Sequence, residues 1–124
     1  MDIFVKKTEK LNVNVYAWAK ENGDIDATPD KNDIPKDAKD VNTIVFVFRK
    51  PSYADSNAIL ASGRITGDAG TSDVMGFQEG IMRNLLIEIH NGDQVIEARA
   101  KDINTLHPSI ARAAIGGLLE VVTI

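Results

Sequence analysis

The chain has 124 residues, of which 44% are hydrophobic and 26% charged, with no cysteine and a net charge of −4. This length and composition fit one folded domain and argue against global disorder. They exclude disulfides and cysteine-ligated metal, and they disfavour nucleic-acid binding, because a phosphate backbone attracts clustered Lys and Arg.

Neither a targeting segment nor a membrane span is expected. No apolar run approaches the roughly 20 residues of a spanning helix, and Ile3-Phe4-Val5 is too short for the core of a signal peptide. We therefore expect a cytoplasmic protein with no membrane partner and no nucleic-acid partner.

Residues 11–18 predict a half-buried β-strand. Leu11, Val13 and Val15 alternate with Asn12 and Asn14, and this period of two places one face of the strand towards a core. Tyr16 and Trp18 continue the second face, so its far end is expected to be covered as well.

Residues 43–49 predict a second strand, because their β-branched and aromatic run is uninterrupted. Such a run is typical of a central strand or one covered on both faces, and we expect it to pair antiparallel with residues 11–18. The intervening residues 20–42 contain two prolines and many Asp and Lys residues. They predict a long, acidic, solvent-exposed loop, or an ordered excursion with turns.

Three helices are predicted after the strands. Ser52 followed by Asp55 is typical of a capping box and begins a helix near 52–62, with Gly63 after its end. Thr71 or Ser72 begins a second helix, near 72–90, because apolar residues recur at helical spacing from residue 74 to residue 89. The third helix, near 108–122, begins at Pro108, with His107 or Thr105 near its cap.

Asn91-Gly92 allows two interpretations of residues 85–98. It ends the second helix as a left-handed cap, or it joins two strands as a tight hairpin turn. We favour the helix, because the 3.6-residue period extends to Ile89. Strands followed by helices then predict an α+β fold in a single domain over residues 1–124: a small antiparallel sheet packed by about three helices.

No arrangement typical of an active site is present in the sequence. His90 and His107 are isolated and fit helix ends, and no G-x-S-x-G occurs. Asp30-Lys31-Asn32 begins like an EF-hand loop, but Ile34-Pro35 breaks that pattern. We therefore predict a protein that is not an enzyme, with no catalytic residue, no metal ligand and no cofactor; weak cation binding by the acidic loop stays open.

The glycine-rich loop 63–71 is the sharpest local feature. It lacks the phosphate-binding pattern G-x-x-x-x-G-K-[ST], and Asp68 would repel an anion. We expect Gly67 and Asp68 to contribute to a protein contact. The alternative function is a small ligand-binding or regulatory module that uses this loop.

The strand-to-helix junction at Arg49-Lys50-Pro51 supplies the other candidate contact residues. Pro51 stops the strand, and Arg49, Lys50 and Tyr53 are expected to form a contact patch, since Arg and Tyr are frequent anchors in protein interfaces.

The order of these segments resembles small morphogenesis proteins of tailed bacteriophages, especially tail assembly chaperones. The resemblance rests on a strand that ends in FVFRKPSYADSNAI, a helical body, and a last helix introduced by Leu106-His107-Pro108. The resemblance spans residues 43–122. It implies a non-enzymatic assembly or structural protein, either a tail assembly chaperone or a minor virion component. Its partners would be tail or other virion subunits, or further copies of the same chain in a homo-oligomer.

Overall fold

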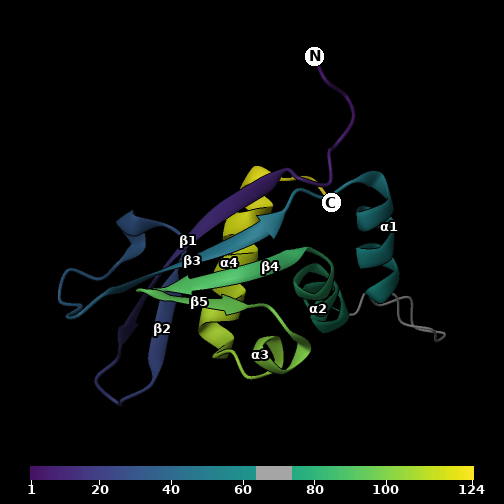
Figure 1. Ribbon diagram of the computed structural model, residues 1–124. Helices are drawn as coiled ribbons and strands as arrows, with labels where there is room; N and C mark the ends of the chain where they lie inside the picture. The colour runs from purple at the N-terminus through teal and green to yellow at the C-terminus, as the bar shows by residue number, and fades with distance from the viewer. Residues whose placement is uncertain (64–73) are drawn as a thin grey trace.

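The computed structural model describes residues 1–63 and 74–124. Within them, a five-stranded antiparallel sheet packs against helices, which confirms the α+β fold (Figure 1). The sheet has the order β2-β1-β3-β4-β5. Its strands are β1 (Lys10–Ala19), β2 (Ile25–Thr28), β3 (Asn42–Arg49), β4 (Leu86–Asn91) and β5 (Gln94–Glu97), and the helices are α1 (Tyr53–Ser62), α2 (Val74–Leu85), α3 (Ala100–Asn104) and α4 (Pro108–Val121).

Both predicted strands are present and pair antiparallel. β1 aligns with β3 from the pair Lys10 and Arg49 to the pair Ala17 and Asn42. β3 lies at the centre of the sheet and is buried on both faces: Phe46 is fully buried on the helix side, and Val47 is 5% exposed on the other. The uninterrupted apolar run thus marked a central strand.

The helices cover one face of the sheet. α4 packs on β1 and β2, α2 packs on β4 and α4, and α1 packs on α2 (Figure 1). The buried side chains that join these layers include Val15, Phe48, Ile81, Leu85 and Leu118. α1 is thereby held to the body through α2, at one end of the sheet.

The prediction of one long loop over residues 20–42 is wrong for its first half. Ile25–Thr28 form β2, which pairs with the last four residues of β1. Ile25 and Ala27 alternate with polar neighbours and pack against the core. This alternation covers only four residues, which is too short to stand out in the sequence. A short 3-10 helix, Lys31–Asp33, follows, and the side chain of Asp30 accepts a hydrogen bond at its start.

The prediction of a helix as far as residue 90 is also wrong. α2 ends at Leu85, and β4 and β5 form the hairpin that was the alternative interpretation. The two turn residues are Gly92 and Asp93, with Asn91 paired to Gln94. Gly92 has a φ of 61°, so glycine suits the first turn position.

The predicted starts of the first and last helices are confirmed. Ser52 Oγ accepts from Asp55 N at 3.3 Å, and Asp55 Oδ2 accepts from Ser52 N at 2.9 Å, which completes the capping box. His107 Nδ1 accepts from Ser109 N at 3.2 Å at the start of α4. Gly63 ends α1 with a φ of −88°, so it is not in the left-handed region. The predicted cap of the second helix, Thr71 or Ser72, lies outside the described residues.

Candidate functional site

Arg49 holds the strand-to-helix junction together. Its Nη1 donates to Asp55 Oδ2 at 2.6 Å, and its Nη2 donates to Asp55 Oδ1 at 2.8 Å and to the carbonyl oxygen of Asn84 at 2.9 Å. These hydrogen bonds join the end of β3 to the start of α1 and to the end of α2. The guanidinium is therefore engaged within the chain.

The electrostatics of the junction follow from this pair. The Arg49 guanidinium, with further hydrogen bonds from Ser52, lowers the pKa of the Asp55 carboxyl to about 2. The carboxylate in turn raises the pKa of Arg49. Charge-assisted bidentate pairs of this kind fix geometry as well as adding stability.

The other predicted contact residues differ in exposure. Lys50 Nζ lies 3.4 Å from Glu9 Oε2, and its side chain is 46% exposed. Tyr53 is 84% exposed at the first position of α1. The structure thus brings Arg49, Lys50 and Tyr53 to one junction, where Lys50 and Tyr53 face solvent. Gly67 and Asp68 lie outside the described residues.

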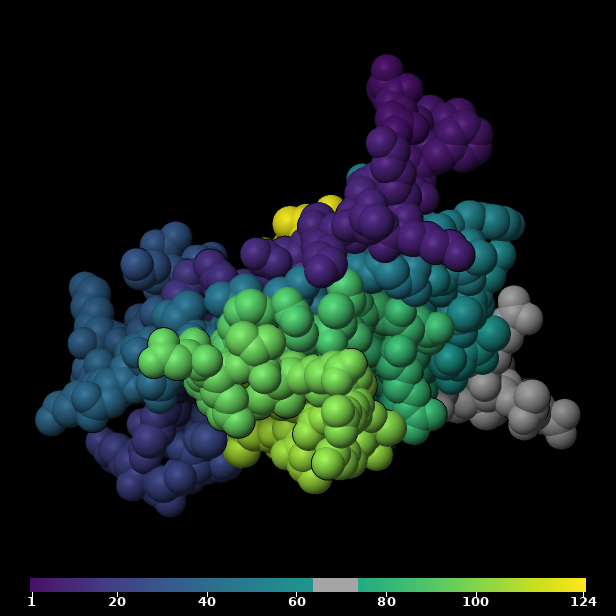
Figure 2. All heavy atoms as spheres, in the orientation of Figure 1, coloured from purple at the N-terminus to yellow at the C-terminus, as the bar shows by residue number. Residues whose placement is uncertain are grey.

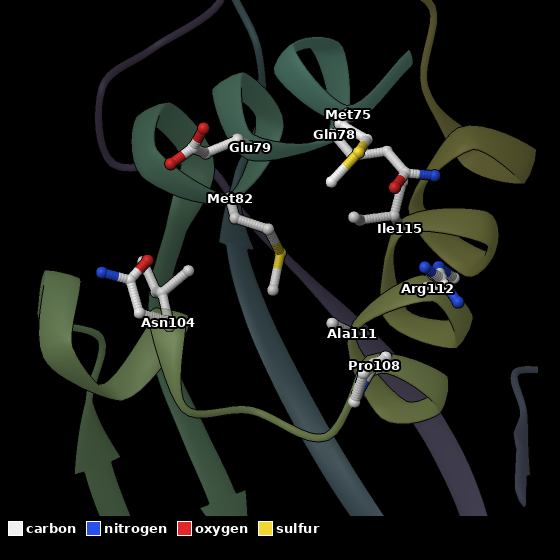
Figure 3. A pocket seen from close by; sticks show the side chains of 10 residues that line it. Met75, Gln78, Glu79, Met82, Asn104, Pro108, Ala111, Arg112 and Ile115 are labelled. Atoms are coloured by element: carbon white, nitrogen blue, oxygen red, sulfur yellow. The ribbon is translucent and has the colours of Figure 1, made fainter.

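A groove with a largely apolar lining lies between α2, α3 and α4. It encloses about 330 Å³. Figure 3 shows the side chain of Met82 pointing from α2 into this groove, with Ala111 and Ile115 on α4 opposite. Its lining comprises Met75, Gln78, Glu79, Met82, Ile103, Asn104, Pro108, Ala111, Arg112 and Ile115.

The residues at the margin of this groove differ in exposure and in charge. Met75 is 78% exposed at one end of it, and a thioether chain with three rotatable bonds adapts to irregular partners. Glu79 forms a salt bridge with Arg83 on α2 and points away from α4 (Figure 3). Arg112, by contrast, is exposed on α4 and has no ion pair within residues 1–63 and 74–124.

The sequence did not point to this groove. On α2, Met75, Glu79 and Met82 recur at helical spacing, which equally fits an ordinary buried face. The third wall is α3, whose five residues are too few to show a period. The groove therefore becomes visible only when α3 is placed against the two longer helices.

The histidines have structural roles in the described residues. His107 Nε2 lies 2.8 Å from Asp24 Oδ1, which links the β1–β2 turn to the start of α4. The pKa of Asp24 is lowered, chiefly by the hydrogen bond from the Ile25 N–H and then by His107. His90 lies in β4, 3.0 Å from Glu88, so its predicted place at a helix end is wrong.

The described residues contain no group of three or more His, Asp or Glu side chains that could hold a metal ion. None of the helices in those same ranges is long and apolar enough to cross a membrane.

Comparisons of the chain with protein-family models, curated proteins and solved structures give no match. Roles for its residues therefore follow from its own sequence and geometry.

Proposed function

We propose that this chain is a non-enzymatic assembly or structural protein that acts through protein–protein contacts. In this proposal the chain is a tail assembly chaperone or a minor virion component of a tailed phage. The groove between α2, α3 and α4 is the observation that carries this proposal.

The chemistry of the groove favours a protein segment over a small substrate. Its floor is formed by apolar side chains such as Met82 and Ile115. The unpaired guanidinium of Arg112 adds one fixed charge. Grooves between helices with flexible methionines take the apolar face of an amphipathic helix.

The partner chemistry follows from these two elements. An amphipathic helix with two or three apolar side chains on one face would fill the space beside Met75 and Met82. A Glu or Asp on the flank of that helix would pair with Arg112. The partner is thus a helical segment of another subunit, apolar on one side and acidic at its margin.

The pattern of turns supports the phage assignment. Arg49-Lys50-Pro51 directly precedes α1, and Leu106-His107-Pro108 directly precedes α4. These are the two steps on which the resemblance to tail assembly chaperones rests.

A binding experiment with matched variants tests the proposal. The chain is expressed together with the products of its neighbouring genes, and the affinity of the co-purified pair is measured by calorimetry. Met75→Lys and Arg112→Glu should each weaken binding about tenfold or more, equivalent to about 1.4 kcal/mol. Val95→Lys changes an exposed apolar residue on β5, and Lys39→Glu reverses an exposed charge, so both serve as controls that should bind within about twofold of the unaltered chain.

Two results would overturn it. Binding that survives both groove variants would remove the groove from the contact. Absence of any complex with the neighbouring products, or equal losses in the controls, would remove the assembly role assigned to this surface.

A further inference from the structure

The sequence contains the tripeptide Asn-Gly-Asp twice, and the two copies lie in different turns of the sheet. Residues 22–24 belong to the turn between β1 and β2, and residues 91–93 belong to the turn between β4 and β5. Both asparagines are exposed. In Figure 2 both turns lie at the molecular surface, residues 20–24 in dark blue and residues 91–94 in green. No other asparagine in the chain is followed by glycine.

An asparagine that precedes a glycine can react with its own main chain. The glycine amide nitrogen, after losing its proton to hydroxide, attacks the side-chain carbonyl carbon Cγ and forms a C–N bond. The bond from Cγ to the side-chain nitrogen breaks, and this nitrogen takes up a proton and leaves as ammonia. Water then opens the resulting five-membered succinimide ring at either carbonyl, which gives aspartate or isoaspartate. Glycine favours the attack because it has no Cβ to obstruct the approach to its nitrogen.

Two hydrogen bonds within the turn hold Asn22 in place. The Gly23 N–H donates to Lys20 O at 3.0 Å, and the Asp24 N–H donates to Asn22 Oδ1 at 3.0 Å. Gly23 has a φ of 86°, as is typical of the last position in a three-residue hairpin loop. Asn22 itself belongs to no strand. It can therefore turn its Cγ towards the nitrogen of Gly23 at the expense of these two bonds, while the ladder between β1 and β2 stays paired.

Asn91 is held by the sheet itself. It is the last residue of β4, and it pairs with Ile44 of β3 on one side and with Gln94 of β5 on the other. An extended backbone keeps Cγ away from the next nitrogen, so the attack on Asn91 needs rotation of its main chain. That rotation would open the ladders on both sides. Opening paired strands costs more free energy than opening a turn.

We propose that Asn22 is a site of spontaneous deamidation and isomerisation in the folded chain. Asn91, in the same tripeptide, is protected by its pairing with β3 and β5. The sequence alone would rank the two sites equally, and the difference between them arises from their places in the sheet.

Isoaspartate at position 22 would alter the contact between this turn and α4. The former side chain becomes part of the main chain, so one methylene is inserted directly before Gly23, and the acceptor of the Asp24 N–H is lost. Asp24 Oδ1 lies 2.8 Å from His107 Nε2 at the start of α4. The reaction therefore displaces the carboxylate that joins the β1–β2 turn to α4, and it adds a negative charge beside Glu21 and Asp24.

Peptide mapping of the aged protein tests the proposal. Trypsin cleaves after Lys and Arg, so it releases residues 21–31 and residues 84–99 as separate peptides, each with one of the two sites. The full chain is kept folded at mildly alkaline pH, and aspartate and isoaspartate are quantified in both peptides by chromatography and mass spectrometry. We expect position 22 to react at least about tenfold faster than position 91. In guanidinium chloride, which unfolds the strands, the two rates should agree within about twofold, because the tripeptides are identical.

Two variants connect the reaction to the contact with α4. Asn22→Gln removes the site, because the longer side chain would have to close a six-membered ring, and Asn91→Gln is its matched control. Ageing should lower the melting temperature of the unaltered chain and of Asn91→Gln, each relative to its own fresh sample, and should leave that of Asn22→Gln unchanged.

Two results would overturn the proposal. Equal rates at the two positions in the folded chain, or a faster reaction at position 91, would show that the sheet does not protect Asn91. Absence of product at position 22, over a time in which the unfolded chain has reacted, would exclude the site. Neither asparagine lines the groove between α2, α3 and α4, so failure here leaves the proposed function standing.

Discussion

Two adjacent glycines on α4 offer a matched test of how closely this helix approaches the sheet. A Cβ added at Gly117 would lie 2.6 Å from Val13 Cγ1 and 2.9 Å from Pro29 Cβ, whereas a Cβ at Gly116 would meet no atom within 4 Å. Alanine at either position should gain about 1 kcal/mol of helix propensity. Only Gly117→Ala must also push apart buried atoms.

The cost of that displacement can be estimated. Overpacking a well-packed core costs about 1–3 kcal/mol, and Val13 yields little because a β-branched side chain has few alternative rotamers. Gly116→Ala should therefore stabilise the protein by about 1 kcal/mol. Gly117→Ala should be about 1–3 kcal/mol less stable than Gly116→Ala.

The assay is urea unfolding followed by the fluorescence of Trp18, the single tryptophan of the chain. Trp18 lies on β1 and is 8% exposed, so its emission should report loss of the sheet. The comparison needs equal dependence of the free energy on urea in both variants. Equal stability of the two variants would refute the close approach of α4 to β1 and β2.

Three further predictions concern the junction, the hairpin and the core. The pKa of Asp55 is lowered to about 2 from 3.8, so its ionised form stabilises the fold above about pH 4, and this contribution is lost as the pH falls towards 2. Asp55→Asn should lower the free energy of unfolding by about 1–2 kcal/mol at pH 7. In thermal melts from pH 7 to pH 2, the difference in stability between this variant and the unaltered chain should vanish, with Asp93→Asn as control. A difference that stays constant with pH would contradict the linkage. Gly92→Ala should cost about 1–2 kcal/mol in urea unfolding because its φ of 61° is left-handed, and a neutral effect would exclude that turn. Tyr53→Ala should change stability by less than about 0.5 kcal/mol, whereas Phe48→Ala should cost about 3–5 kcal/mol, and similar melts for the two would refute their opposite burial.

Two of the five described strands, and the starts of the first and last helices, could be predicted from the sequence. β1 shows a period of two over many residues, and β3 shows an unbroken β-branched and aromatic run, so each pattern had one dominant interpretation. Ser52 with Asp55 and His107 with Ser109 act locally, through hydrogen bonds that span two or three residues. Signals of this kind need no knowledge of the tertiary structure.

The end of α2 could not be predicted, for a reason that lies in β4. Phe48 pairs with Leu86 and Val47 with Glu88, so Ile87 is an extra residue in the strand. This bulge puts the buried residues Leu86 and Ile89 three positions apart. That spacing is the one expected for a helix, and it continued the period of α2 across the boundary.

The candidate contact surfaces depended still more on tertiary structure. The Arg49 side chain was expected at a surface patch, yet its bond to Asn84 joins residues 35 positions apart. The groove unites three helices. Neither arrangement leaves a periodic trace in the sequence.

The contact through the groove is tested most directly by photo-crosslinking. A benzophenone side chain is placed at position 75 in the chain expressed with the products of its neighbouring genes, and at position 95 as control. We predict that position 75 crosslinks to the apolar face of one helix that bears a flanking Glu or Asp, and that position 95 does not. Crosslinks shared by both positions, or none from position 75, would contradict a protein contact at this groove.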